Sequence, residues 1–117
     1  MFNTVTARHI FVTNAAGKVV VHLDATDDGD GLVRTKSAKG KILVTLSASQ
    51  GGNGLVWTQS GEGKELVGLR ATEDGGLIDI LNKTGESIAQ MRADEYGNGY
   101  IIAANRKGKG RTLQPGP

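Results

Sequence analysis

The sequence predicts an all-β protein of about five β-hairpin repeats, each 22 to 23 residues long, in an antiparallel meander covered by oligomerisation. Three observations indicate this fold. Glycines recur at intervals of 23, 23, 22 and 23 residues, apolar and polar side chains alternate around them, and no stretch carries apolar residues at helical spacing. The recurring glycines are Gly17, Gly40, Gly63, Gly85 and Gly108.

The clearest copy of the repeat runs from Gly31 to Ala48 and reads GLVRTKSAKGKILVTLSA. Residues 54–71 and 76–93 align with it. An earlier copy ends at residue 25, and a degraded copy begins at residue 99. Each copy has the length of two short strands joined by a turn, which is the length of a β-hairpin.

The turn inside each repeat begins with Asn or Ser and ends with Gly, as in residues 37–40. A short polar side chain can bond back to the backbone there, and glycine accepts a positive φ. A four-residue loop would pair Thr35 with Ile42 and Val33 with Val44, which places apolar side chains on one face. A three-residue loop would mix the two faces. We therefore predict four-residue loops built on a type I turn.

The other face of the predicted sheet also carries apolar side chains, in two stripes. Stripes on both faces indicate that parts of the sheet are covered on both sides, by a further layer or by a second subunit. One stripe contains Val20, Leu43, Leu66 and Ile88, and the other contains Leu32, Leu55, Leu77 and Tyr100.

Three arrangements suit a two-strand unit of this size: an antiparallel meander, an up-and-down barrel, and a β-solenoid of stacked coils. Tight turns favour antiparallel hairpins and argue against the solenoid. Few aromatic residues and many glycines predict a thin core, which identical repeats cover more readily by self-association than by closing a barrel. We therefore expect a homo-oligomeric meander, with a trimer as one arrangement that would cover the sheet.

Composition bounds the organisation of the chain. The 117 residues suit a single β-repeat domain, 1–117, in which residues 1–8 form a leading strand or arm and residues 114–117 a disordered tail. The net charge of +2 is too small to indicate a nucleic-acid partner, and no stretch is apolar enough to span a membrane. The absence of cysteine excludes a disulfide framework.

The densest carboxylate group lies near the first acidic loop. Oxygen ligands clustered with glycine are what calcium prefers, so this group is a candidate metal site. No EF-hand loop is present, and a solvated turn is the favoured interpretation; no cofactor is predicted. The four carboxylates are Asp24, Asp27, Asp28 and Asp30.

Trp57 breaks the pattern of the repeat, because Arg34, Asp79, Ile102 and Phe11 occupy its position in the other copies. An exposed Trp can anchor a subunit interface or stack on a sugar ring. We favour the interface. The candidate interface or ligand residues are Trp57, Phe11, Arg34 and Tyr100.

No motif for catalysis is present. His9 and His22 have neither metal-ligand spacing nor a nucleophile beside them, and no glycine-rich loop ends as a P-loop does. The basic group at residues 106–111 is interpreted as solvating charge that protects the last strand. The sequence thus predicts a non-enzymatic structural or adhesive module acting through self-association and surface loops. The alternative is a module that binds a carbohydrate or other small ligand with exposed aromatic residues.

Overall fold

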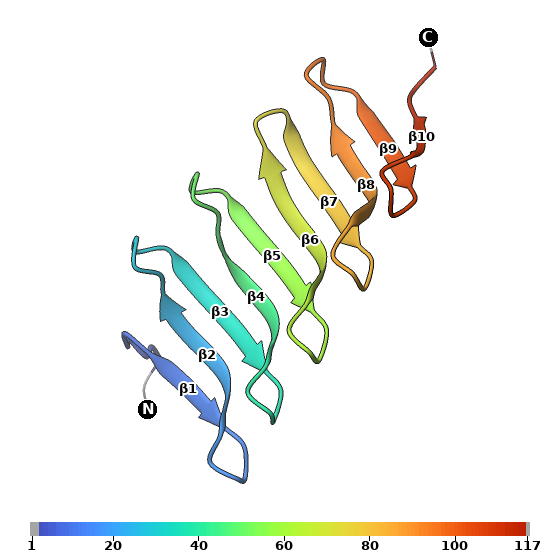
Figure 1. The fold of residues 1–117 in the computed structure, drawn as a ribbon. Helices are drawn as coiled ribbons and strands as arrows, with labels where there is room; N and C mark the ends of the chain where they lie inside the picture. The colour runs from blue at the N-terminus through green and yellow to red at the C-terminus, as the bar shows by residue number, and fades with distance from the viewer. Residues whose placement is uncertain (1–2, 117) are drawn as a thin grey trace.

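A computed structural model describes residues 3–116 as one ten-stranded β-sheet (Figure 1). The strands lie side by side in chain order, and every neighbouring pair is antiparallel. The predicted all-β meander of hairpins is therefore confirmed. The strands are β1 (Ile10–Thr13), β2 (Val19–Ala25), β3 (Gly31–Lys36), β4 (Ile42–Ala48), β5 (Gly54–Gln59), β6 (Glu65–Thr72), β7 (Gly75–Leu81), β8 (Ser87–Ala93), β9 (Gly99–Ala104) and β10 (Gly110–Leu113).

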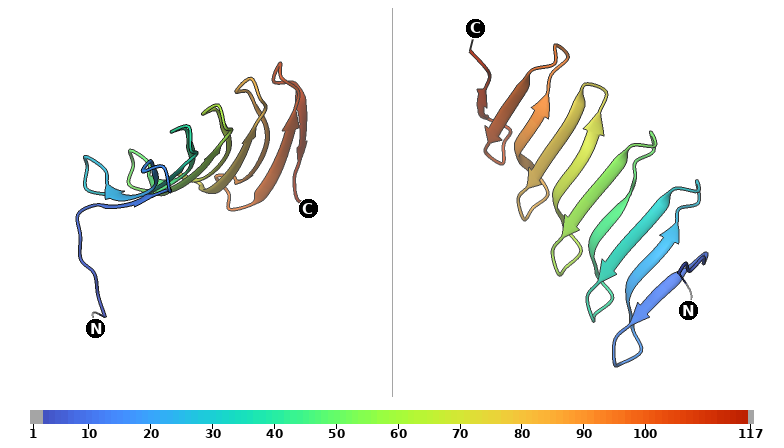
Figure 2. Two further views of the ribbon diagram at one scale, coloured as in Figure 1. Left: turned by 90° about the horizontal axis from the view of Figure 1, so that it is seen from below. Right: turned by 180° about the vertical axis from the view of Figure 1, so that it is seen from behind.

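The sheet is open. Within the described residues β1 pairs only with β2 and β10 only with β9, so the barrel alternative is not formed. The antiparallel pairing likewise differs from the parallel stacking that a solenoid requires. Figure 2 shows the described residues as a single twisted and curved layer, with no second layer of these residues against either face. Its principal extents are 59 × 30 × 25 Å.

The turns at the ends of β1, β3, β5, β7 and β9 have three-residue loops, so the predicted four-residue loop is wrong. In the β3–β4 hairpin the Gly40 N–H donates to the Ser37 carbonyl at 2.9 Å, as a type I turn requires. The Ser37 N–H donates to the Lys41 carbonyl at 2.8 Å and closes the loop. Gly40 has a φ of +82°, in the left-handed region predicted for it.

A β-bulge reconciles this shorter loop with a single apolar face. Lys36 pairs with Ile42, whereas Thr35 pairs with Val44, so Leu43 is an extra residue on β4. The extra residue shifts side-chain parity by one, which is the same shift that a fourth loop residue would produce. Side-chain parity alone therefore could not distinguish a four-residue loop from a three-residue loop followed by a bulge. The observed pairs are Thr35–Val44 and Val33–Leu46 in place of the predicted Thr35–Ile42 and Val33–Val44.

The same register shift occurs in the β1–β2, β5–β6 and β7–β8 hairpins, but not in β9–β10. The fifth hairpin therefore places its side chains one position out of step with the other repeats. Leu113 pairs with Ile101 on the apolar face, whereas its counterpart in the repeat, Thr45, pairs with Trp57 on the other face. The degraded fifth repeat in the sequence corresponds to this unbulged hairpin.

The turns at the opposite ends of the strands are regular. The Thr26 N–H donates to the Asp30 carbonyl at 2.7 Å, and Gly29 has a φ of +92°. In the shorter β6–β7 hairpin Thr72 pairs directly with Gly75. The one-residue deletion thus falls inside the loop and leaves both strands in register.

Among residues 3–116, the segments before β1 and after β10 add no strand to the sheet. Residues 3–9 precede β1 and residues 114–116 follow β10, and neither segment belongs to a strand. Residues 1–2 and 117, which the predicted arm and tail include, lie outside the described residues. No helix long and apolar enough to cross a membrane occurs in residues 3–116.

Candidate functional site

The sheet exposes one apolar face along its whole length. Leu46 is 44% exposed, Leu69 43% and Met91 52%, although each lies in the middle of its strand. In residues 3–116 the only buried apolar side chain is Leu77, which lies on the other face. The single layer therefore leaves this surface, here called the apolar face, without a cover. Its exposed large side chains are Ile10, Val12, Leu23, Leu46, Leu69, Ile78, Ile80, Met91, Ile101 and Leu113.

The opposite face, here called the polar face, has one row of paired residues at its centre. The row crosses all ten strands, because each member pairs with the next across the sheet. Aromatic, charged and small residues therefore lie beside one another in chain order. The row contains Phe11, His22, Arg34, Thr45, Trp57, Gly68, Asp79, Gln90, Ile102 and Thr112.

The Trp57 ring lies close to Gly68, its pairing partner on β6. A Cβ placed on Gly68 would be 2.6 Å from the Trp57 ring, so the ring occupies the space that a side chain at position 68 would need. The guanidinium carbon of Arg70 lies 5.3 Å from the centroid of the ring, within the range of a cation–π contact. The Trp57 ring thus contacts both the backbone at Gly68 and the guanidinium of Arg70.

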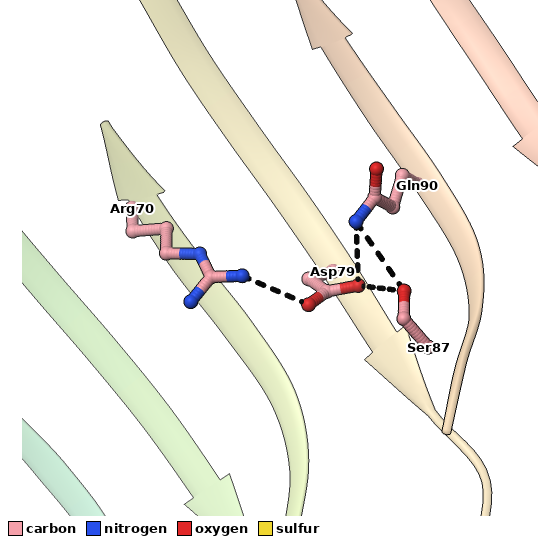
Figure 3. A network of polar contacts seen from close by, with 4 residues as sticks. All are labelled: Arg70, Asp79, Ser87 and Gln90. Carbon is pink, nitrogen blue, oxygen red and sulfur yellow. Dashed lines mark hydrogen bonds and ion pairs between the residues drawn. The ribbon is translucent and has the colours of Figure 1, made fainter. Parts of the chain in front are cut away.

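Asp79 connects this contact to the next two strands (Figure 3). Its side chain accepts a hydrogen bond from Arg70 at 3.0 Å and another from Gln90 at 3.2 Å. The hydroxyl of Ser87 also donates to it. Asp79 is only 4% exposed, and a buried carboxylate is tolerated when its oxygens are paired in this way.

Sequence reasoning singled out Trp57 but missed Gly68 and Arg70, which contact its ring. It also missed Ser87 and Gln90, which share the carboxylate of Asp79 with Arg70. The sequence did contain one indication of the contact with Trp57. Gly68 interrupts the strand at a position where the other copies carry a side chain, and such a glycine often marks close approach of another group.

The four predicted aromatic and cationic candidates all lie on the polar face but do not meet. Phe11 is on β1, Trp57 on β5 and Tyr100 on β9, so consecutive members are four strands apart, about 19 Å at 4.8 Å per strand. Arg34 is on β3, between the first two. Tyr100 instead has the Arg92 guanidinium 5.7 Å from its ring centroid. They form separate contacts rather than one ligand pocket.

The four carboxylates of the predicted metal site lie in two different segments of the chain. Asp24 lies in β2 with its carboxylate 2.8 Å from His9 Nδ1, whereas the other three belong to the following turn. In residues 3–116 no group of three or more His, Cys, Asp or Glu side chains is placed to hold a metal ion. Within the described residues, Asp24, Asp27, Asp28 and Asp30 are thus not part of such a group.

A hydrogen bond from the Ala25 N–H holds the pKa of Asp24 below its ordinary value of 3.8, and the neighbouring His9 acts in the same direction. The folded state therefore binds fewer protons than the unfolded chain between the two pKa values. Any stability that this carboxylate contributes is present above pH 3.8 and is lost as the pH falls through the folded value.

Comparison with known proteins adds no assignment. No protein-family model matches the sequence, and no similar curated protein is found.

Proposed function

We propose that the chain is a structural or adhesive module without chemistry of its own, which works by associating with further copies of itself. The supporting observation is the apolar face, open to solvent over ten strands. Soluble monomers rarely expose a continuous apolar surface of that kind, because it costs free energy in water. Covering it with the same face of other copies leaves the turns and the polar face outward, where they can present or connect other parts.

The test uses two substitutions at adjacent positions of β4. Leu46→Lys places a charge on the apolar face, where it would be buried unpaired in the oligomer. Thr45→Lys adds the same charge to the opposite face of the same strand. The mass of each protein is measured by light scattering behind a sizing column at several concentrations.

We expect the natural chain and Thr45→Lys to be multimers, and Leu46→Lys to shift to monomer or to a dissociation constant at least tenfold higher. Circular dichroism checks that each variant retains its sheet. A natural chain that is monomeric at all concentrations, or two variants with the same mass, would contradict the proposal.

Ligand binding by the polar face is the second candidate function, and one observation favours it. Phe11, 51% exposed, lies beside His22 in the central row, and Arg34 follows. His22 Nδ1 and Arg34 Nε are buried without a hydrogen-bond partner in the described part of the chain. Retention on immobilised polysaccharides tests this candidate: Phe11→Ala would abolish retention and leave the oligomer unchanged if the face binds sugar.

A further inference from the structure

The turns form two rows along the sheet, one row at each end of the strands. These two rows, called edges below, carry opposite charge. The meander sends its turns alternately to the two ends of the strands, as Figure 1 shows. One edge, here called the basic edge, consists of turn residues 14–18, 37–41, 60–64, 82–86 and 105–109. The other, the acidic edge, consists of turn residues 26–30, 49–53, 72–75 and 94–98.

All Lys and Arg residues of these turns are on one edge, and most of the turn carboxylates are on the other. The basic edge carries eight cations, Lys18, Lys39, Lys41, Lys64, Lys83, Arg106, Lys107 and Lys109, against two carboxylates, Glu62 and Glu86. The acidic edge carries seven carboxylates, Asp27, Asp28, Asp30, Glu73, Asp74, Asp94 and Glu95, and no Lys or Arg.

These edge charges have no ion partner within the described chain. The ion pairs in residues 3–116 are His9–Asp24 and Arg70–Asp79, and neither belongs to an edge turn. A strand of six residues, such as β3, separates the edges by about 20 Å at 3.3 Å per residue. This exceeds the Debye length of about 8 Å at physiological salt. Only another molecule can bring opposite edges together.

We propose that three copies of the chain associate around one axis along the length of the sheet. All three point the same way, their apolar faces turn inward, and the basic edge of each lies against the acidic edge of the next. The proposal rests on the self-association proposed above. Rotation about such an axis brings unlike edges together at every corner. A copy turned end for end would instead bring like edges together, which repel.

The length of the strands suits three copies. Three sheets of width about 20 Å close a triangular prism whose centre lies about 6 Å from each sheet. That is close to half of the roughly 10 Å that separates packed sheets, so one layer of side chains from each sheet fills the interior. The middle row of the apolar face, with Leu46, Leu69 and Met91, supplies that layer.

The side chains next to the acidic edge favour three copies over a flat two-copy sandwich. On the apolar face this row contains only Ala and Gly, in cross-strand pairs. In a sandwich the sheets stay equally far apart there and small side chains would leave a gap. In a prism adjacent sheets converge at the corner, where the small side chains of one sheet leave room for the larger row beside the basic edge of the next, such as Val44 and Ile80. The pairs are Ala25–Gly31, Ala48–Gly54, Ala71–Gly76 and Ala93–Gly99.

Thiol cross-linking tests the arrangement, because the chain has no cysteine. Asp28→Cys labels the acidic edge and Lys39→Cys labels the basic edge. The double variant and both single variants are treated, at a concentration where the natural chain is multimeric, with a flexible thiol-to-thiol cross-linker too short to span 20 Å. Products are resolved by denaturing electrophoresis, alongside light scattering of the untreated proteins.

We expect the double variant to give covalent species that stop at three chains, and both single variants to remain uncross-linked. Double-variant products that stop at two chains would overturn the three-fold arrangement. Cross-linked single variants would show that like edges meet, and would overturn the common direction. A multimer without cross-links in the double variant would reject the edge contact while leaving self-association intact, whereas a monomer would reject both proposals.

Discussion

Single glycines determine where the chain reverses direction. Gly63 ends a basic-edge turn with a φ of +87°, and a Cβ there would meet only Cδ of the Lys41 side chain, at 4.0 Å. The requirement for glycine at this position is therefore a requirement of the backbone, not of packing.

Substituting this glycine isolates the backbone effect. We expect Gly63→Ala to lower the free energy of unfolding by about 1–2 kcal/mol, the cost of a left-handed conformation for a residue with a Cβ. Gly61 stands two residues earlier in the same turn without a positive φ and with open space around it. Gly61→Ala should therefore leave the urea midpoint unchanged. Equal midpoints for the two variants would contradict the turn geometry.

Gly68 has a different role, because its missing side chain makes room for the Trp57 ring. We expect Gly68→Ala to destabilise the fold by about 1–3 kcal/mol through overpacking. In a Trp57→Ala background the same change should cost much less, since the ring is gone. Urea denaturation of the four proteins, followed by circular dichroism at one protein concentration, measures this coupling. Additive costs would show that the two residues act independently.

Between strands, the polar face is held together by side-chain contacts that cross β6, β7 and β8. Asp79 is central, because it accepts hydrogen bonds from Arg70 on β6 and from Ser87 and Gln90 on β8. A single sheet without a second layer depends on such cross-strand contacts more than a protein with a buried core does.

Removing this carboxylate should weaken three strands at once. We expect Asp79→Ala to lower the free energy of unfolding by about 1–3 kcal/mol, because its donors lose their shared acceptor. Asp79→Asn keeps one acceptor oxygen and should cost less. Hydrogen exchange should speed up in β6 to β8 and stay unchanged in β2 and β3. A uniform change over the whole sheet would contradict a local role for this network.

At the scale of the whole molecule, the chain is a one-dimensional array. In the described residues each strand contacts only the strands before and after it. Arrays of this kind derive their stability from repeats and their neighbour interfaces, so whole repeats can be removed.

Deleting residues 31–53 joins Asp30 to Gly54, which begins β5 as Gly31 begins β3. We expect an eight-stranded sheet that melts cooperatively at a lower temperature and keeps the same number of copies in its oligomer. Deleting residues 31–41 instead removes one strand and reverses the direction of the rest, so this control should lose most of its sheet signal. Equal circular dichroism spectra for the two deletions would contradict the array description.

Most contacts among the residues of the candidate site could not be predicted from the sequence. The internal repeat identified Trp57, because its position departs from the other copies. It could not show that Phe11, Trp57 and Tyr100 stay four strands apart, or that Arg70 and Gln90 reach Asp79 from either side. Those facts depend on which strands are neighbours and on where each side chain points.

The sequence by itself determined the period, the strands, the glycine turns and the alternation that creates an apolar face, because each depends on residues close together in the chain. Only the tertiary structure decided the bulged register, the open rather than closed sheet and the separation of charge onto two edges. These depend on pairing between strands. A loop residue and a bulge shift parity equally, so local pattern cannot choose between them.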